Sequence, residues 1–180
     1  HEVLAAEFGA ERVLSAVVDV TVEDDITALL DLADTVGGVD VMINNAGLGG
    51  TASILEMTDD QWSKVLDITL TGIFRSVRAA STRMIANGTK GVIVNNASVI
   101  GWRAQEGQAH YAAAKAGIMG LTFAIATELA AAGVTSNAIA PAASTRMSEA
   151  SRADFEHMLA EGIIDDAVWL DADGHPRVRD

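Results

Sequence analysis

Short apolar runs alternate with longer segments in which apolar residues recur every three or four positions. The short runs are rich in Val and Ile and end in polar residues or Gly, which is typical of buried parallel strands. The longer segments begin at capping residues and end at Gly, as amphipathic helices do. The predicted caps are Thr21 and the capping box of Thr58 and Gln61. The pattern predicts a short helix at 2–8, strands at 12–18, 39–47, 91–101 and 134–141, and helices at 21–38, 58–88 and 108–132.

Strands that alternate with helices predict an α/β protein with a parallel sheet. Ligands in such sheets bind outside the carboxyl ends of the strands, so polar residues that follow a strand are candidates for binding and catalysis. After residue 147 the pattern changes to an amphipathic helix and then to a polar, charged tail with no clear final strand. We therefore expect an α/β core followed by a segment of different character.

Charge and residue content exclude several classes of protein. Asp and Glu number 25 against 12 Lys and Arg, for a net charge of -13, whereas binding of nucleic acid needs clustered cations. There is no cysteine and no paired spacing of metal ligands, so we expect no metal site. No apolar run has the length needed to span a bilayer and no signal segment is present, so we expect no membrane partner and a cytoplasmic location.

One predicted helix and two strand tips carry residues suited to proton transfer. Tyr111 and Lys115 are four residues apart in HYAAAK, so they share one face of a helix. A lysine cation near a phenol favours the phenolate and lowers its pKa from about 10, which makes the pair a proton shuttle. Ser98 follows the preceding strand, where its hydroxyl can hold a carbonyl oxygen. Asn45 offers an amide in the tip NNAG, beside small residues that let a ligand approach the backbone.

Together these features resemble the short-chain dehydrogenase/reductase family. Five motifs occur in the order and at the spacings of that family: VVDVT (17–21), INNAG (43–47), NASVIG (96–101), HYAAAK (110–115) and SNAIAP (136–141). The resemblance extends from about residue 10 to residue 147. It implies a doubly wound, Rossmann-like parallel sheet, with a partial core over 1–147 and a divergent C-terminal helix and polar tail over 148–180.

The resemblance implies hydride transfer between NAD or NADP and a secondary alcohol or ketone. Tyr111 would be the general acid and base, Ser98 would orient the carbonyl group, and Lys115 would lower the pKa of the tyrosine and bind the nicotinamide ribose. The implied cofactor site comprises Asp19 and Val20 against the adenine, Asn45, Ala46 and Gly47 against the adjoining ribose, Tyr111 and Lys115, and Pro141 and Thr145 near the nicotinamide.

Three departures from the family pattern modify these expectations. No G-x-x-x-G-x-G turn occurs in the 180 residues, so we expect a fold truncated at the N-terminus that lacks the glycine-rich cofactor-binding segment. Thr69 stands where the family usually has an asparagine that holds a proton-relay water, and a hydroxyl can also hold water. PAASTRM (141–147) and the stretch 101–122 resemble members that act on acyl-CoA thioesters, which indicates an acyl-CoA-linked substrate.

Three hypotheses for the function follow. The first is an NAD(P)-dependent oxidoreductase that acts on a small-molecule alcohol or ketone. The alternative is a non-catalytic protein that acts through self-association. The third is that the chain is part of a longer, ordinary enzyme of the family. In that family the helices at 59–86 and 108–132 would form the interface of a homo-oligomer.

Overall fold

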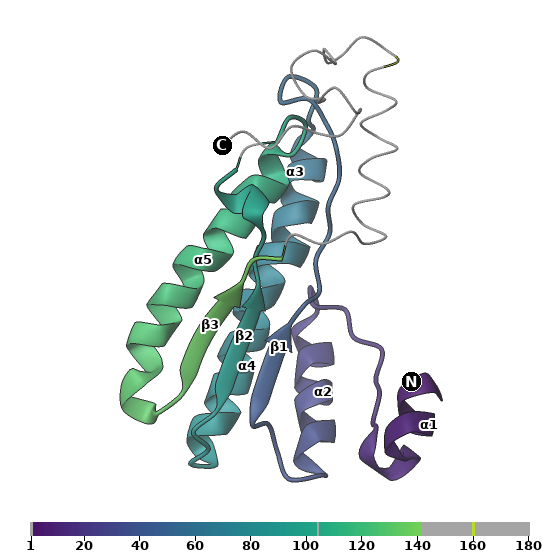
Figure 1. Cartoon of the computed structure of the whole chain (residues 1–180), viewed down its shortest axis with the longest axis vertical. Helices are drawn as coiled ribbons and strands as arrows, with labels where there is room; N and C mark the ends of the chain where they lie inside the picture. Colours follow the sequence, from purple (N-terminus) through teal and green to yellow (C-terminus); the bar gives the residue numbers. More distant parts are fainter. Residues whose placement is uncertain (1, 104, 142–159, 161–180) are drawn as a thin grey trace.

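A three-stranded parallel sheet forms the centre of the computed structural model, which describes residues 2–103, 105–141 and 160 (Figure 1). The strands are β1 (Val41–Asn44), β2 (Val92–Asn96) and β3 (Thr135–Ile139), in the order β1-β2-β3. Their carboxyl ends meet at one edge, since Asn44 is in register with Asn95, and Asn96 with Ile139. The predicted α/β fold with a parallel sheet is therefore confirmed.

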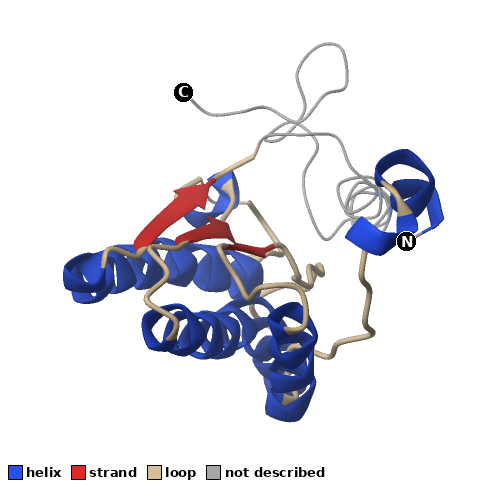
Figure 2. Cartoon of the chain, turned by 90° about the horizontal axis from the view of Figure 1, so that it is seen from below, coloured by secondary structure: helices blue, strands red, loops and turns tan. Residues whose placement is uncertain are grey.

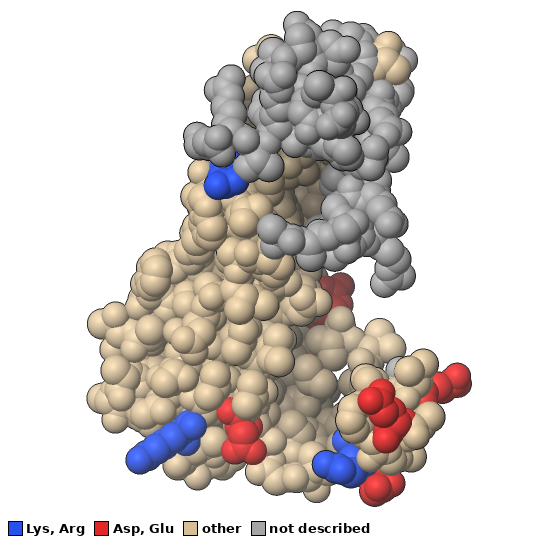
Figure 3. All heavy atoms as spheres, viewed as in Figure 1, with Lys and Arg blue, Asp and Glu red and all other residues tan. Residues whose placement is uncertain are grey.

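Helices cover one face of this sheet among the described residues (Figure 2). They are α2 (Glu23–Asp34), α3 (Asp59–Leu66), α4 (Gly72–Ala86) and α5 (Ala109–Leu129); a short helix α1 (Glu2–Phe8) lies apart from them. The other face of the sheet carries few charges (Figure 3) and exposes Val41, Ile43 and Ile139. The packed layer therefore lies between the strands and α2–α5.

Apolar side chains from β2, α4 and α5 form the main core between the sheet and the helices. Alternation along β2 directs Ile93 toward the helices, where it is fully buried. The main cluster consists of Ile73, Val77, Met84, Ile93, Ala97, Ile118, Ile125 and Val134, and a second cluster joins Ile26, Leu30 and Ala80 under α2. This core packs α4 and α5 against the sheet.

The predicted strand at 12–18 is wrong. In the structure, Ala10–Arg12 form one 3-10 turn, and residues 13–19 have no regular secondary structure. Val17 is fully exposed, whereas Val18 packs against the cluster under α2. Residues with high β-propensity form a strand only when a neighbouring strand accepts their hydrogen bonds, and no described strand lies beside this segment.

One of the two helix starts predicted from capping residues is confirmed. Thr58 and Gln61 form a complete capping box at α3, in which the Gln61 amide donates to the Thr58 hydroxyl at 3.2 Å. The cap predicted at Thr21 is wrong, because Val22 precedes α2 and makes no side-chain cap. The Thr21 hydroxyl instead donates to the carboxylate of Asp19 at 2.7 Å.

The continuous helix predicted at 58–88 is two helices joined by a π-helical turn over Asp67–Thr71. A π-turn inserts one residue into the helical ladder and is frequent at functional sites. The ion pair between Arg75 and Asp67, at 2.9 Å, bridges this turn and α4. The predicted ends at glycine are confirmed: Gly88 and Gly133 follow their helices with φ of 67° and 76°.

Helix α5 and the 3-10 turn after it (Ala130–Ala132) are more apolar than expected. This 24-residue unit is long and apolar enough, by length and composition alone, to cross a membrane, which corrects the expectation that no run has that length. Many of its apolar residues pack on the sheet, including Ala114 and Ile118. The segment assigned to 148–180 lies outside the described residues, apart from residue 160, so the boundary at 147 remains a prediction.

Candidate active site

Ser98, Tyr111 and Lys115 meet at the carboxyl edge of the sheet, as the sequence predicts. Ser98 follows β2, and its hydroxyl accepts a hydrogen bond from the amide of Ile100 at 3.2 Å, which fixes the turn. The Ser98 side chain also hydrogen-bonds Tyr111, which lies in the first turn of α5. One turn later, Lys115 places Nζ 5.4 Å from the centroid of the tyrosine ring. The spacing of four residues thus brings phenol and amine together on one face of α5.

Burial controls the proton affinities of both groups. It raises the pKa of Tyr111 above its ordinary value, and the hydrogen bond from Ser98 opposes this rise. Burial lowers the pKa of Lys115 to about 8, because only 4% of the residue is exposed and the ammonium loses its hydration. The sequence interpretation assigned the main effect on the tyrosine to the lysine cation. In the structure, burial has the larger effect, so the phenol is neutral near pH 7.

Replacing Ser98 by Ala is expected to raise the pKa of Tyr111 further, because the variant loses the hydrogen bond that stabilises the phenolate. Tyr111 is the only tyrosine in the chain, so the ultraviolet absorbance of the phenolate reports on this residue alone. A titration of both proteins measures the effect, and we expect the pKa of Tyr111 to be higher in the variant. An unchanged or lower pKa in the variant would contradict the contact between these two side chains.

Thr69, in the π-turn, holds the loop that follows the NNAG tip. It is fully buried, and its hydroxyl donates to the carbonyl of Leu48 at 3.0 Å and accepts from the amide of the same residue at 2.9 Å. A Cβ added at Gly47 would lie 3.6 Å from the Thr69 methyl group and 3.9 Å from Lys115 Nζ. The hydroxyl expected to hold water is therefore engaged with the backbone and sets the path of this loop past Lys115.

The Thr69→Val variant is expected to lose about 1–3 kcal/mol of stability, because both backbone groups of Leu48 lose their partner while the shape of the side chain is kept. Chemical denaturation of the two proteins measures the difference. Thr69→Ser is the matched control. It keeps the hydroxyl and loses one methyl group, so its stability should be close to that of the parent. Equal stability of the valine variant and the parent would refute the role of this hydroxyl.

A chain of buried amides and hydroxyls lies beneath the strand tips, and sequence reasoning did not find it. Asn44 donates to the side chain of Asn95 at 2.9 Å, and Asn95 donates to the hydroxyl of Thr122 on α5 at 3.0 Å. Asn95 and Thr122 are almost completely buried. Buried polar groups of this kind specify a unique packing when each finds a partner. This series of hydrogen bonds therefore fixes how β1, β2 and α5 pack together beneath the site.

Three of the five residues expected to contact the adenine and its ribose line one cavity, and Asp19 and Gly47 do not. The cavity has a volume of about 220 Å³, and its lining includes Val20, Asn45 and Ala46, at the carboxyl end of β1. Asp19 lies between the lining residues Val18 and Val20. The pKa of Asp19 is lowered, mainly by the hydrogen bond from the Thr21 side chain and also by the charge of Arg75. Apolar walls with amides at one end suit a flat aromatic base joined to a sugar.

Of the two residues expected near the nicotinamide, the structure describes Pro141 but not Thr145. Pro141 follows β3 and is exposed at the same edge of the sheet. Thr145 lies outside the described residues, so its contact with the nicotinamide remains a prediction. Within the described part of the chain, no group of three His, Asp or Glu side chains is arranged to hold a metal ion.

Comparison with known proteins gives consistent results. A family model described as short chain dehydrogenase matches residues 1–156. A (5R,7aS)-5-hydroxy-7a-methyl-1-oxo-2,3,5,6,7,7a-hexahydro-1H-indene-carboxyl-CoA reductase of Mycobacterium tuberculosis is 52% identical over 134 residues, which are 74% of this chain and 51% of the relative. The 3-oxoacyl-[acyl-carrier-protein] reductase FabG of Vibrio cholerae is 41% identical over 68% of this chain and 50% of its own length.

Solved structures agree with these relatives. A short chain dehydrogenase from Mycobacterium smegmatis superposes with a TM-score of 0.69 at 44% identity, covering 78% of this chain and 61% of the other. Sorbitol-6-phosphate 2-dehydrogenase of Erwinia amylovora superposes with a TM-score of 0.73 at 31% identity, covering 77% of this chain and 55% of the other. The chain spans about half the length of the curated relatives that it matches.

Proposed function

Because this chain belongs to the short-chain dehydrogenase family, whose model matches residues 1–156, we propose that the protein is an oxidoreductase that transfers a hydride between NAD or NADP and a ketone or secondary alcohol. The observation that carries the proposal is the contact of Ser98 with Tyr111 beside the buried Lys115. The named relatives with the highest identity are reductases, and they give no support to the alternative of a non-catalytic protein.

The proton affinities favour reduction of a ketone at neutral pH. Burial raises the pKa of Tyr111, so its phenol is protonated and can act as a general acid. The nicotinamide cofactor supplies the hydride. The hydroxyl of Ser98 holds the carbonyl oxygen near the phenol, and Tyr111 donates its proton to that oxygen as negative charge develops there. Lys115, next to the ring, stabilises the phenolate that remains.

The described residues fit the nucleotide part of the cofactor. The cavity at the end of β1, which Val20, Asn45 and Ala46 line, would hold the adenine and its ribose. Asp19, whose pKa is lowered, would accept a hydrogen bond from the exocyclic amine of the base. Lys115 binds the nicotinamide ribose, and Pro141 and Thr145 contact the nicotinamide in this proposal.

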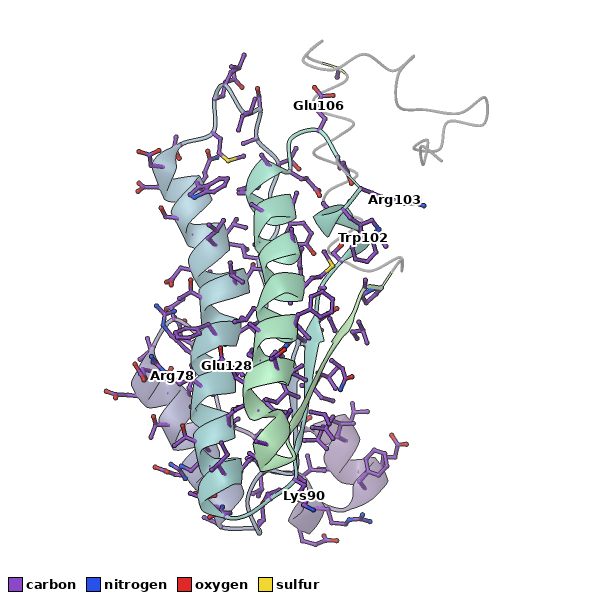
Figure 4. All side chains as sticks on the ribbon, turned by 90° about the vertical axis from the view of Figure 1, so that its left-hand side faces the viewer. Arg78, Lys90, Trp102, Arg103, Glu106 and Glu128 are labelled. Carbon is purple, nitrogen blue, oxygen red and sulfur yellow. The ribbon has the colours of Figure 1, made fainter. Side chains whose placement is uncertain are left out.

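The substrate that we propose is a ketone carried on a coenzyme A thioester. The relative from Mycobacterium tuberculosis with 52% identity is a carboxyl-CoA reductase, and the 41% identical FabG is a 3-oxoacyl reductase. Trp102 and Arg103 follow Ser98 on an exposed turn and project from the same end of α5 as the site (Figure 4). An aromatic ring and a cation at this position suit a long substrate with an anionic carrier.

The proposal is tested by mixing the protein with NADH or NADPH and acetoacetyl-CoA and following the loss of nicotinamide absorbance. Cofactor-dependent reduction that disappears in the Ser98→Ala and Tyr111→Phe variants would support the proposed site. Reduction of simple cyclic ketones but not of the thioester would retain the oxidoreductase and overturn the substrate. Absence of cofactor binding and of reduction in the parent protein would overturn the proposed function itself.

We propose further that the protein forms a homo-oligomer through α3, α4 and α5. These helices expose large aromatic side chains, with Trp62, Phe74 and Phe123 exposed by 38%, 44% and 73%. Exposed aromatic residues on packed helices are typical of interfaces. The apolar outer side of α5 is explained in the same way, since a partner helix would cover it.

The Phe123→Glu variant is expected to shift the protein toward the monomer, because a charge in the centre of an apolar interface is left without a partner. Sedimentation velocity measures the mass of both proteins, and we expect at least a tenfold weaker association. Val17→Glu, which changes an exposed residue of the segment before α2, is the control and should associate as the parent does. A parent that is monomeric throughout would contradict this interface.

A further inference from the structure

A side-chain hydrogen bond joins β1 and β2 one residue beyond the end of their backbone ladder. The ladder ends where Asn44 is paired with Asn95. In the next position, the amide nitrogen of Asn96 donates to the amide oxygen of Asn45 at 2.7 Å. Parallel strands diverge where their ladder stops, because nothing then holds the two backbones together. The pair therefore links the two strands one position beyond the last backbone pairing.

Asn96 also contacts the catalytic side of the site through its backbone. Its carbonyl oxygen accepts a hydrogen bond from Lys115 Nζ at 2.5 Å. The backbone of Asn96 is held from the other side by β3, where it is in register with Ile139, and the next amide, that of Ala97, donates to the Ile139 carbonyl at 2.8 Å. One residue thus touches Asn45 on one side and Lys115 on the other.

The orientation of the Asn96 side-chain amide does not favour the stability of the folded protein. Its oxygen Oδ1 is inaccessible to water and has no hydrogen-bond partner within the described residues. A buried acceptor without a partner is unfavourable for folding and is rare in native proteins. This orientation does direct the Asn96 NH₂ group at Asn45. It is therefore the donor function of Asn96 that the arrangement preserves.

The bond determines which group Asn45 presents to a ligand. Because its oxygen accepts from Asn96, the amide plane of Asn45 is fixed and its NH₂ group is turned away from β2. No other hydrogen bond of the Asn45 side chain is present in the part of the chain that the structure describes. Asn45 also lines the cavity at the end of β1. A ligand in this cavity therefore meets the NH₂ group of Asn45 as a donor that is already oriented, and not an amide group that is free to rotate.

We propose that Asn96 is a positioning residue that orients the Asn45 amide, so that its NH₂ group donates to a ribose oxygen of the bound dinucleotide. The inference rests on the proposed oxidoreductase function and adds to it a residue that does not touch the cofactor. Preorientation reduces the conformational entropy that binding would otherwise cost. Loss of the Asn96 side chain therefore weakens cofactor binding through Asn45, while the backbone carbonyl that holds Lys115 is kept.

A double-mutant cycle on cofactor affinity tests this coupling. The parent, Asn45→Ala, Asn96→Ala and the double variant are titrated with NADH and NADPH, with nicotinamide fluorescence as the signal. Each single variant is expected to raise Kd about fivefold, the equivalent of one neutral hydrogen bond. The double variant should raise Kd no further. Asn137→Ala, an exposed residue of β3, is the control and should bind as the parent does.

Two further readouts separate positioning from general damage. The Asn96→Ala variant should raise KM for the cofactor about fivefold and leave kcat within about twofold, because the backbone acceptor for Lys115 remains. The melting temperatures of the same four proteins report whether the two side chains are coupled without a ligand. Additive effects on Kd, or an unchanged Kd in Asn96→Ala, would overturn the proposal. A parent that binds neither cofactor would overturn the proposed function and this inference with it.

Discussion

Replacement of Tyr111 by Phe is expected to lower kcat about 10³-fold, because the variant keeps the ring and loses the proton donor. The raised pKa of Tyr111 means that the neutral phenol is the form that donates near pH 7. The Kd of the cofactor should stay within about twofold of the parent, since the cavity at β1 is untouched. Initial rates with saturating cofactor and substrate, together with fluorescence titration of the cofactor, measure both quantities.

The matched comparison is Ser98→Ala, which keeps the phenol and removes its hydrogen-bonding neighbour. This variant should lose about 10²-fold in kcat, less than the tyrosine variant, because a phenol without Ser98 can still donate its proton. A Tyr111→Phe variant that turns over at the parent rate would show that another group supplies the proton. A serine variant that is the more damaged of the two would reverse the two assigned roles.

Replacement of Lys115 by Met is expected to lower kcat about 10²-fold, since no cation then remains beside the phenolate. The variant should nevertheless be more stable than the parent at pH 7. Lys115 is almost fully buried and its ammonium is held by one carbonyl, that of Asn96. Methionine fills a similar volume without the cost of desolvating a charge.

The pH dependence of this stability difference has a definite sign. The pKa of Lys115 is about 8 in the folded protein and near 10.5 when the lysine is exposed to water. Between these two pH values the unfolded state binds more protons, so the stability of the parent rises with pH relative to the methionine variant. Below pH 8 the parent carries the full cost of burying the charged lysine, which is of the order of 3 kcal/mol.

Thermal melts of the parent and the Lys115→Met variant from pH 7 to pH 10.5 measure this difference. Subtraction of the two curves removes groups that Lys115 does not contact. Tyr111 does contact it, but its raised pKa acts in the opposite direction only at pH values above its ordinary pKa of 10. A difference that is constant across this range would contradict the lowered pKa of Lys115.

The candidate catalytic group was predictable because its members are marked by local sequence. A spacing of four residues on a helix brings Tyr111 and Lys115 to one face, and the end of a parallel strand brings Ser98 to the same edge. The capping box of Thr58 and Gln61 was predictable for the same reason, since both partners lie within one turn. Each of these features depends on residues that are close together in the chain or on the strand order alone.

The residues that sequence reasoning missed act through partners far along the chain. Thr69 was recognised as a departure from the family, but its partner Leu48 is 21 residues away. The pairs of Asn96 with Asn45 and of Asn95 with Asn44 each join residues 51 positions apart. No local pattern shows which of several asparagines will face one another. The register of the two strands decides it.

The sequence by itself determined the order and type of most elements, the parallel α/β architecture and the identity of the residues at the strand tips. It could do so because hydrophobic periodicity and capping act within a few residues. Only the tertiary structure decided that 12–18 forms no strand and that burial, rather than the lysine charge, controls the pKa of Tyr111. Those outcomes depend on strand pairing and on exclusion of water, which arise only when distant segments pack together.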